Sequence, residues 1–212
     1  RLHIGFERLR RLVSRVSDAP PSLHTAKEHS CPACLEANAT RHGHPHVAYE
    51  RSYPGRLIHA DIVGPFRPSH IHGYRFMLVI VDDHSRFKQV YFLRSKDEAM
   101  SRARRFVNSV NAYASRGKAE PVRIVGSMKT DNAGEFLSRE FREFVDEEGI
   151  DHTTCPPHVH QLNGVAERAI RSIMEQVRSN IVASGAPVTF WPYMAQHACD
   201  VLNRTSGPPE SE

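Results

Sequence analysis

The sequence predicts a mixed α/β fold, in which one sheet carries helices on both of its faces. Three strand-like segments follow one another between residues 56 and 95. Helical and strand-like segments then alternate from residue 97 to residue 155, and two more helical segments follow. Three strands followed by alternating helices and strands are typical of a mixed α/β sheet, whose apolar faces need helices to cover them.

Five segments are predicted as strands. Residues 57–66 form an apolar run that ends at the Gly-Pro pair of "LIHADIVGPF". Residues 74–85 have a continuous apolar middle, "FMLVIV", which is typical of a buried central strand. Residues 86–95 follow so closely that this segment should pair antiparallel with the preceding one. Residues 121–131, "PVRIVGSMKTD", and residues 150–155, "IDHTTC", are the fourth and fifth predicted strands.

Four helices are predicted after the first three strands, at residues 97–114, 138–149, 165–185 and 189–203. Their apolar residues recur at helical spacing, as with Phe106, Val107 and Val110 in the first of them. The second helix should begin at Ser138, a suitable N-cap, and end at Gly149.

The beginning of the chain has a different composition. Residues 4–17, "IGFERLRRLVSRVS", have helical spacing, and "DAPPS" ends that helix. Residues 22–48 are rich in His, Cys and Lys and offer little for an apolar core, so we expect a metal to stabilise this segment. Cys31 and Cys34 form a Cys-x-x-Cys pair, which favours reduced thiols and metal binding in a chain without secretory signals.

Length and composition suit one main domain with a small appendage, in a chain of 212 residues. We expect a metal-binding segment and linker in residues 1–50, the α/β domain in 51–207, and the start of a linker to a further part in 208–212. Both ends resemble cuts through a longer polypeptide. No apolar run approaches the roughly 18–20 residues of a membrane span, and no signal peptide is recognisable.

The net charge of +4 gives a mild preference for polyanionic partners. Basic residues gather between positions 84 and 118, where only Asp97 and Glu98 oppose them. We interpret this segment mainly as a partly solvated surface, with a contact to DNA as the alternative. The basic residues are Arg86, Lys88, Arg94, Lys96, Arg102, Arg104, Arg105, Arg116 and Lys118.

Three acidic residues occupy positions where burial disfavours a charge. Asp61 lies inside an apolar strand, Asp131 ends the fourth strand, and Glu167 lies beside the apolar stripe of a long helix. An isolated buried carboxylate costs roughly several kcal/mol unless it is paired or binds a cation. If the three converge, their repulsion raises their pKa values, and divalent ions remove that penalty. Oxygen ligands suit Mg²⁺ or Mn²⁺, and two such ions would clamp the attacking and leaving oxygens of a phosphoryl transfer.

Each acid also has an ordinary interpretation. Asp61 would then bond to the following turn, and Asp131 would begin an Asx-turn at "DNAG". Glu167 would pair with Arg171 one helical turn away, a contact worth about a few tenths of a kcal/mol. The order and the surroundings of the three acids, considered together, favour the metal site.

The sequence resembles the integrases of copia-type LTR retrotransposons, which belong to the retroviral integrase superfamily. The interval of 35 residues between Asp131 and Glu167 is part of this resemblance. The motifs that carry it are "HADIVGPF" (59–66), "VIVDDHSRF" (79–87), "TDNAGEF" (130–136), "QLNGVAER" (161–168) and "VLNR" (201–204), with "HIGFERLRRL" and "CPAC" in the front end.

The resemblance implies an RNase H-like core, a mixed five-stranded sheet flanked by helices, preceded by a small helical zinc-binding segment. Asp61, Asp131 and Glu167 become the DDE triad. Asp61 would bridge two Mg²⁺ or Mn²⁺ ions, and each of the other two acids would complete one ion's site. The implied reactions are trimming of DNA 3′ ends and their transfer into target DNA.

The resemblance also implies DNA contacts around the triad. Gln161 and Asn163 occupy a loop that would line the same cleft. Arg168 and Arg171, next to Glu167 on the helix, would reach phosphates of the approaching DNA.

The front end would carry an HHCC-type zinc site that is incomplete in this chain. His3 corresponds to the second histidine, and Cys31 and Cys34 correspond to the two thiolates. The first histidine would precede residue 1, although tetrahedral zinc needs four ligands. His24 or His29 is an alternative fourth ligand.

The partners implied are the ends of the element's DNA and the target DNA, together with further copies of the chain, and no membrane. Integration would take place in the nucleus, after a stage in cytoplasmic particles, and the protein would not be secreted. A DDE transposase is a second interpretation, which the Cys-x-x-Cys pair disfavours. A third is a decayed or domesticated copy that binds DNA without catalysis, which the intact triad disfavours.

Overall fold

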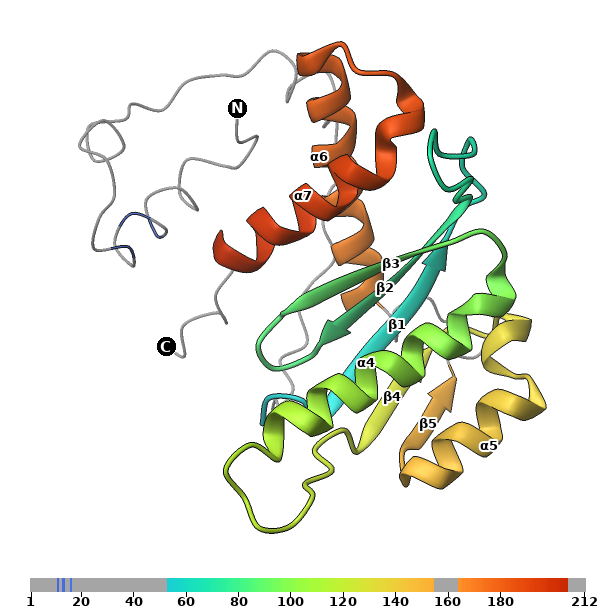
Figure 1. Ribbon diagram of the computed structural model, residues 1–212, viewed down its shortest axis with the longest axis vertical. Coiled ribbons are helices and arrows are strands. Elements are labelled where there is room, and N and C mark those ends of the chain that lie inside the picture. The colour runs from blue at the N-terminus through green and yellow to red at the C-terminus, as the bar shows by residue number, and fades with distance from the viewer. Residues whose placement is uncertain (1–10, 12, 14–15, 17–52, 155–163, 206–212) are drawn as a thin grey trace.

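A computed structural model of the chain describes residues 53–154 and 164–205, together with Arg11, Val13 and Val16 (Figure 1). The helix predicted over residues 4–17 and the metal-binding segment therefore lie almost wholly outside the described residues. The proposed domain boundaries remain predictions for the same reason.

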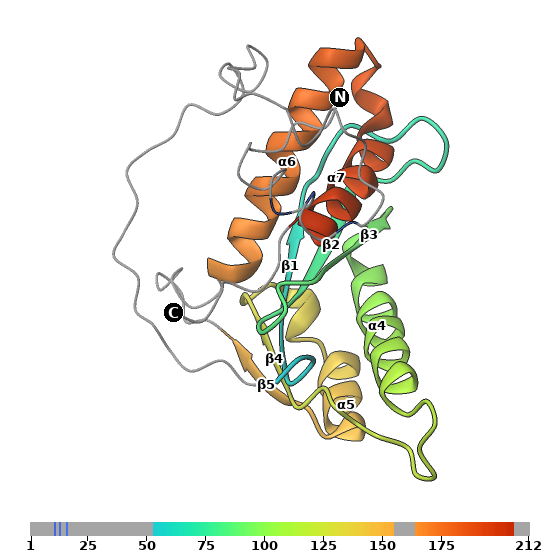
Figure 2. The ribbon, with the colours of Figure 1, turned by 90° about the vertical axis from the view of Figure 1, so that its left-hand side faces the viewer.

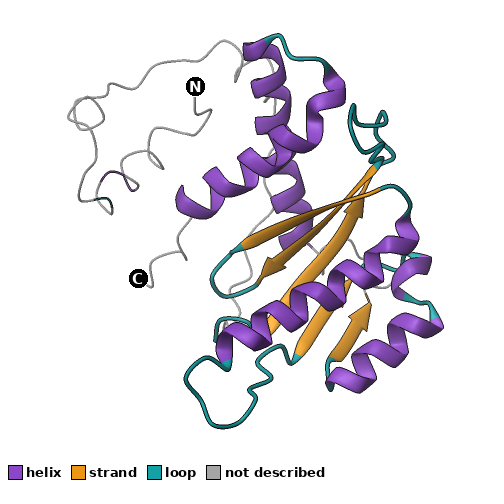
Figure 3. Ribbon diagram, viewed as in Figure 1, coloured by secondary structure: helices purple, strands orange, loops and turns teal. Residues whose placement is uncertain are grey.

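A mixed five-stranded sheet forms the centre of the described part (Figure 3). Its strands are β1 (Leu57–Val63), β2 (Phe76–Asp82), β3 (Lys88–Leu93), β4 (Ser127–Thr130) and β5 (Asp151–Thr154), in the order β3-β2-β1-β4-β5. Strand β2 is antiparallel to both β1 and β3, whereas β4 is parallel to β1 and to β5. Strands β1, β3, β4 and β5 therefore all point the same way, and their carboxyl ends meet at one edge of the sheet.

Helices cover both faces of the sheet, as the sequence predicted. Helices α4 (Ala99–Ala114) and α5 (Arg139–Glu148) share one apolar core with the sheet. Helices α6 (Gly164–Ser184) and α7 (Trp191–Thr205) share the other. Figure 2 shows α4 and α5 on one side of the strands and α6 on the other. Short 3-10 helices precede α4, α5 and α7, at Lys96–Glu98, Gly134–Phe136 and Val188–Phe190.

The alternation of side chains along β1 decides which residues face which helices. Ile58 and Ala60 are buried in the core beneath α4 and α5. Because neighbouring residues of a strand point to opposite faces, His59 and Asp61 face the α6 side. The second predicted strand is buried along almost its whole length, which confirms the interpretation of its apolar run.

One predicted strand is shorter than expected. The pattern predicted a strand over residues 121–131, but β4 contains only Ser127–Thr130. The preceding segment is bound to the end of α4 instead. Val122 N donates to Ser115 Oγ at 2.8 Å, and Ile124 N donates to Asn111 Oδ1 at 3.0 Å. Helix α5 follows the prediction closely: Ser138 Oγ accepts from Phe141 N, and Gly149 has a left-handed φ of 66°.

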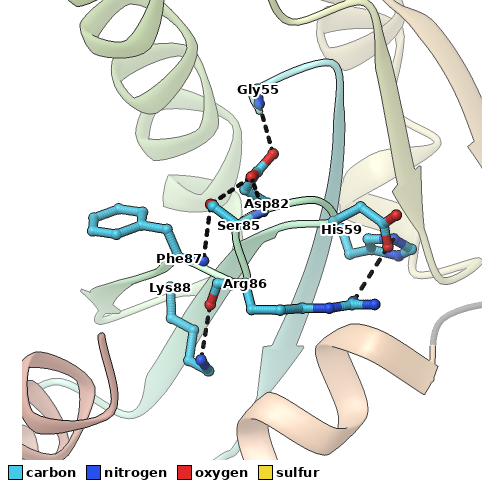
Figure 4. A network of polar contacts seen from close by, with 8 residues as sticks. Gly55, His59, Asp82, Ser85, Arg86, Phe87 and Lys88 are labelled. Carbon is cyan, nitrogen blue, oxygen red and sulfur yellow. Dashed lines mark hydrogen bonds and ion pairs between the residues drawn. The ribbon is translucent and has the colours of Figure 1, made fainter. Parts of the chain in front are cut away.

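The turn between β2 and β3 is fixed by two adjacent carboxylates (Figure 4). Asp82 accepts from Ser85 N at 2.7 Å and from Gly55 N at 2.8 Å, which ties the turn to the segment before β1. Asp83 lies 3.0 Å from His59 Nε2 and 3.2 Å from an Arg86 guanidinium nitrogen. The buried charge of Asp83 is thus matched by polar groups from β1 and from its own turn.

The free edge of β3 is closed by α7. Lys88 N donates to Asn203 Oδ1 at 2.8 Å, and Asn203 Nδ2 donates to Lys88 O at 2.7 Å. One amide side chain thus bonds both backbone groups of a residue, as a neighbouring strand would, and this protects the edge from pairing with other chains. Within the described ranges, none of the helices combines the length and the apolarity needed to cross a bilayer.

Candidate active site

Asp61 lies in β1 opposite Val79 of β2, on the face that α6 covers. Its carboxylate accepts a hydrogen bond from Ile62 N at 2.7 Å. The pKa of Asp61 is raised from 3.8 to about 7, chiefly by burial and then by the negative charges of Asp131 and Glu167, against the opposing effects of the Ile62 bond and the charge of Lys96. Asp61 is therefore held where its ionised form is disfavoured, as the sequence predicted.

Asp131 directly follows β4 at the sheet edge where the carboxyl ends meet. His59 is paired with Lys129 in the parallel β1–β4 ladder, and the same register continued by two residues places Asp131 beside Asp61. Asp131 Oδ1 also accepts from Ala133 N at 3.2 Å, so the Asx-turn that we considered as the ordinary interpretation does form. That single bond leaves the carboxylate with further acceptor sites, and its charge still acts on Asp61.

The backbone around Asp131 is supported from β5. Thr130 is buried, and its hydroxyl donates to Asp131 O at 2.9 Å. His152 Nε2 lies 2.9 Å from the same hydroxyl. Burial lowers the pKa of His152, and the charge of Arg142 lowers it further, so the ring is neutral at physiological pH.

Glu167 occupies the first turn of α6 and is half-buried. Its charge raises the pKa of Asp61, so the helix brings it to the two aspartates from across the sheet face. Among the ion pairs between described residues, none joins Glu167 to Arg171. The structure therefore does not contain the ion pair with Arg171 that the ordinary interpretation of Glu167 requires. Arg168 and Arg171 are both exposed on α6.

The three carboxylates do not already form a three-ligand site. In the part of the chain that the structure describes, no three His, Cys, Asp or Glu side chains are close enough together to bind one metal ion. The donor set nevertheless fits divalent cations, because the charges of two carboxylates act on a third, Asp61, whose ionised form burial also disfavours. Mg²⁺ needs only one or two carboxylates and keeps its remaining ligands as water.

Lys96 is a residue of this site that the sequence analysis did not single out. Lys96 follows β3 at the same edge of the sheet. Its positive charge lowers the pKa of Asp61, as the Ile62 bond does, whereas burial and the charges of Asp131 and Glu167 raise it. The sequence placed it only within a basic segment, because the order and direction of the strands are needed to see where β3 ends.

The other predicted site residues lie outside the described residues. These are Gln161 and Asn163 in the proposed DNA-binding loop, and His3, Cys31 and Cys34 in the proposed zinc site, with its alternatives His24 and His29. Their roles remain predictions.

Comparison with known sequences supports the resemblance that the motifs indicated. Residues 51–160 match the integrase core domain family. A Pol polyprotein of transposon TNT 1-94 from Nicotiana tabacum is 35% identical over 153 residues, 72% of this chain and 11% of the polyprotein. The polyprotein of transposon RE1 from Arabidopsis thaliana is 28% identical, over 84% of this chain and 12% of the polyprotein. A Ty1 Gag-Pol polyprotein from Saccharomyces cerevisiae is 24% identical over 87% of this chain and 11% of the polyprotein. This chain therefore spans about a tenth of the length of these relatives.

Solved structures support the fold. The simian T-cell lymphotropic virus intasome bound to a PP2A regulatory subunit aligns with a TM-score of 0.53 at 22% identity, over 91% of this chain and 66% of the matched one. The HTLV-2 integrase catalytic core domain in complex with magnesium aligns with a TM-score of 0.47 at 22% identity, over 70% of this chain and 86% of the matched one. The sheet order, the flanking helices and the sequence match agree: this chain belongs to the integrase core domain family and is related to the Pol polyproteins of copia- and Ty1-type retrotransposons.

Proposed function

We propose that this chain is the catalytic region of a retrotransposon integrase, which trims DNA 3′ ends and joins them to target DNA. The observation that supports the proposal is that the charges of Asp131, after β4, and Glu167, on α6, both act on the buried Asp61 of β1, whose pKa is raised to about 7. Membership of the integrase core domain family supports it.

The three acids would hold two divalent ions. Asp61, between the other two, would contact both ions, whereas Asp131 and Glu167 would contact one each. When bound, the ions would activate the attacking oxygen and stabilise the leaving oxygen of the phosphoryl group. The chain itself would position the phosphate and exclude misaligned water, and it needs no covalent link to DNA.

Each acid is supported in a different way for this task. Asp61 is fixed by a paired strand and by its bond to Ile62 N. Asp131 is fixed by its turn and, through Thr130, by His152. Glu167 is carried by a long helix whose Ala169 and Ile173 are packed in the core. Ligands on rigid elements hold a metal more accurately than ligands on loops.

The proposed partners are the DNA ends of the element, target DNA and further copies of the chain. One of the matched structures is an intasome, and the matched relatives are transposon polyproteins. The basic charge of the chain suits a polyanionic partner. Such a protein would act in the nucleus.

The test is Glu167→Gln, which keeps the shape of the side chain and removes its charge. Cleavage and strand-joining would be measured on branched DNA with Mn²⁺, and DNA binding would be measured separately. We expect activity to fall by at least about 100-fold, because a metal ligand is lost, while DNA binding persists.

Glu175→Gln is the matched control, because Glu175 lies two turns further along the same helix and has a comparable exposure. It should retain activity. Activity that survives Glu167→Gln would remove Glu167 from the site. A wild-type chain that binds DNA but never cleaves it, at any Mn²⁺ concentration, would favour the domesticated DNA-binding protein instead.

A further inference from the structure

Lys96 lies at the sheet edge where the three carboxylates meet. It is the first residue of the 3-10 helix that follows β3, and β3 points in the same direction as β1 and β4. Asp61 near the end of β1, Asp131 after β4 and Lys96 after β3 therefore share one edge. The topology thus places a lysine at the same edge of the sheet as the two aspartates.

The side chain of Lys96 is held by its neighbours but is not enclosed. Its Nζ lies 3.2 Å from Glu135 Oε1 and 6.0 Å from the centre of the Phe76 ring. Glu135 is mostly covered, with 17% of its side chain exposed, whereas 41% of the Lys96 side chain is exposed. Glu135 belongs to the turn that follows Asp131, so the pair joins the segment after β3 to the segment that carries a proposed ligand. One side of the ammonium is fixed, and part of it remains accessible.

Several other basic side chains of the same segment are directed elsewhere. Arg104 pairs with Glu147 at 3.2 Å and lies over the Phe144 ring, on the α4–α5 side of the sheet. Arg102 of α4 lies 4.0 Å from Glu98, the last residue of the 3-10 helix before α4. The positive charge that reaches Asp61 is that of Lys96. Lys96 also contacts residues of the α4–α5 side, Phe76 and Glu135, so it differs from these arginines in its partner and in its place at the edge of the sheet.

We propose that Lys96 binds a phosphate of the DNA backbone beside the reacting phosphate, which competes with Glu135 for its ammonium. This inference rests on the proposed function. A cluster of carboxylates repels a polyanion, so a fixed positive charge at its edge favours the approach of the strand. Lysine binds phosphate as a point charge with rotatable donors and does not require the two-pronged geometry of arginine.

The two members of the pair should behave differently if this is correct. Lys96→Gln removes the charge that contacts phosphate, whereas Glu135→Gln removes a competing negative charge and leaves the lysine available. An ion pair with only a structural role would instead give two variants with the same small loss of stability and unchanged DNA binding.

The experiment measures the binding of a fluorescent DNA duplex by anisotropy, in Ca²⁺, over a series of salt concentrations. We expect Lys96→Gln to weaken binding about 3- to 10-fold near 0.1 M salt and to lower the slope of log K against log salt by about one. Lys96→Arg should keep most of the wild-type affinity and most of the wild-type salt slope. Glu135→Gln should bind at least as tightly as the wild type. Lys118→Gln is the control for net charge, because Lys118 is exposed beyond the end of α4.

A second measurement needs no variant. Acetylation of lysines in the wild-type chain, read by mass spectrometry, should be slower at Lys96 when DNA is bound and unchanged at Lys118. Equal binding and equal salt slopes for Lys96→Gln and Lys118→Gln, or no protection of Lys96, would overturn the inference.

The outcome can be separated from that of the proposed function. Both readouts report binding, whereas the proposed function is tested by Glu167-dependent cleavage. A chain that cleaves DNA but shows no effect at Lys96 refutes this inference alone. A chain that binds DNA through Lys96 but has no activity refutes the catalytic proposal alone, and a chain that does not bind DNA refutes both.

Discussion

Replacing Asp61 with asparagine should stabilise the metal-free protein at alkaline pH. In the folded chain the pKa of Asp61 is about 7, against an ordinary value of 3.8. A difference of about three pH units corresponds to about 4 kcal/mol between the two protonation states. Part of the carboxylate remains in contact with water, so we expect about 1–3 kcal/mol of this to be measurable.

The sign follows from the direction of the pKa change. Below the unfolded value of 3.8, Asp61 is protonated in both states and costs nothing. Between 3.8 and about 7 the unfolded state ionises while the folded state keeps its proton, so the stability of the wild type falls relative to Asp61→Asn over this range and the difference is constant above it. The free energy of unfolding would be obtained from urea titrations in EDTA, at about pH 4.5 and about pH 8. The advantage of Asp61→Asn over the wild type should grow between these two conditions.

Two comparisons make the result specific. Asp151→Asn removes an exposed carboxylate from β5 of the same sheet and should show no such growing advantage. Adding Mn²⁺ at the higher pH should stabilise the wild type more than Asp61→Asn, because the ion neutralises the repelled carboxylates. If the advantage of Asp61→Asn is constant or shrinks as the pH rises, the carboxylate is not strained, and the electrostatic argument for the site is wrong.

The remaining predictions concern stability. Asn203→Ala should lower the free energy of unfolding by about 1–3 kcal/mol, because it removes the two hydrogen bonds that the Asn203 amide makes with the backbone of Lys88. His197→Ala, at an exposed position of the same helix, should change it by less than about 0.5 kcal/mol, and equal effects would show that the edge contact is unimportant. Ser138→Ala should cost about 1 kcal/mol, because the N-cap bond to Phe141 N is lost; urea titration measures it, and no loss would show that water replaces the cap.

Sequence patterns were sufficient for the elements of this fold because most of its segments keep their local character after folding. The apolar run of β2 lies between two other strands, as a run without polar residues requires. Ser138 and Gly149 mark the ends of α5, because capping depends on the chemistry of single residues. The predicted fourth strand was too long because Asn111 of α4 and Ser115, the residue after α4, bind the backbone that the pattern assigned to the sheet.

The three acids were recognisable because a charge inside an apolar pattern is unusual whichever way the chain folds. Lys96 was not, because a lysine in a polar turn is ordinary until the neighbouring strands are known. The direction of β3 follows from two antiparallel pairings, and only these pairings place its end at the same edge of the sheet as Asp61 and Asp131. The residues around Lys96 in the sequence give no indication of either pairing.

The balance of charges at this edge explains why one lysine does not replace metal ions. Among the effects on Asp61, burial is the largest, the charge of Asp131 comes next, and the effect of Lys96 is the smallest of all. The ammonium is also shared with Glu135, which reduces what it offers to the aspartates. The pKa of Asp61 consequently stays near 7 with Lys96 in place, so the repulsion remains for divalent cations to cancel. Lys96 is placed to act on the phosphate side of the site, where a polyanion meets the carboxylates, and the metals would act between the carboxylates themselves.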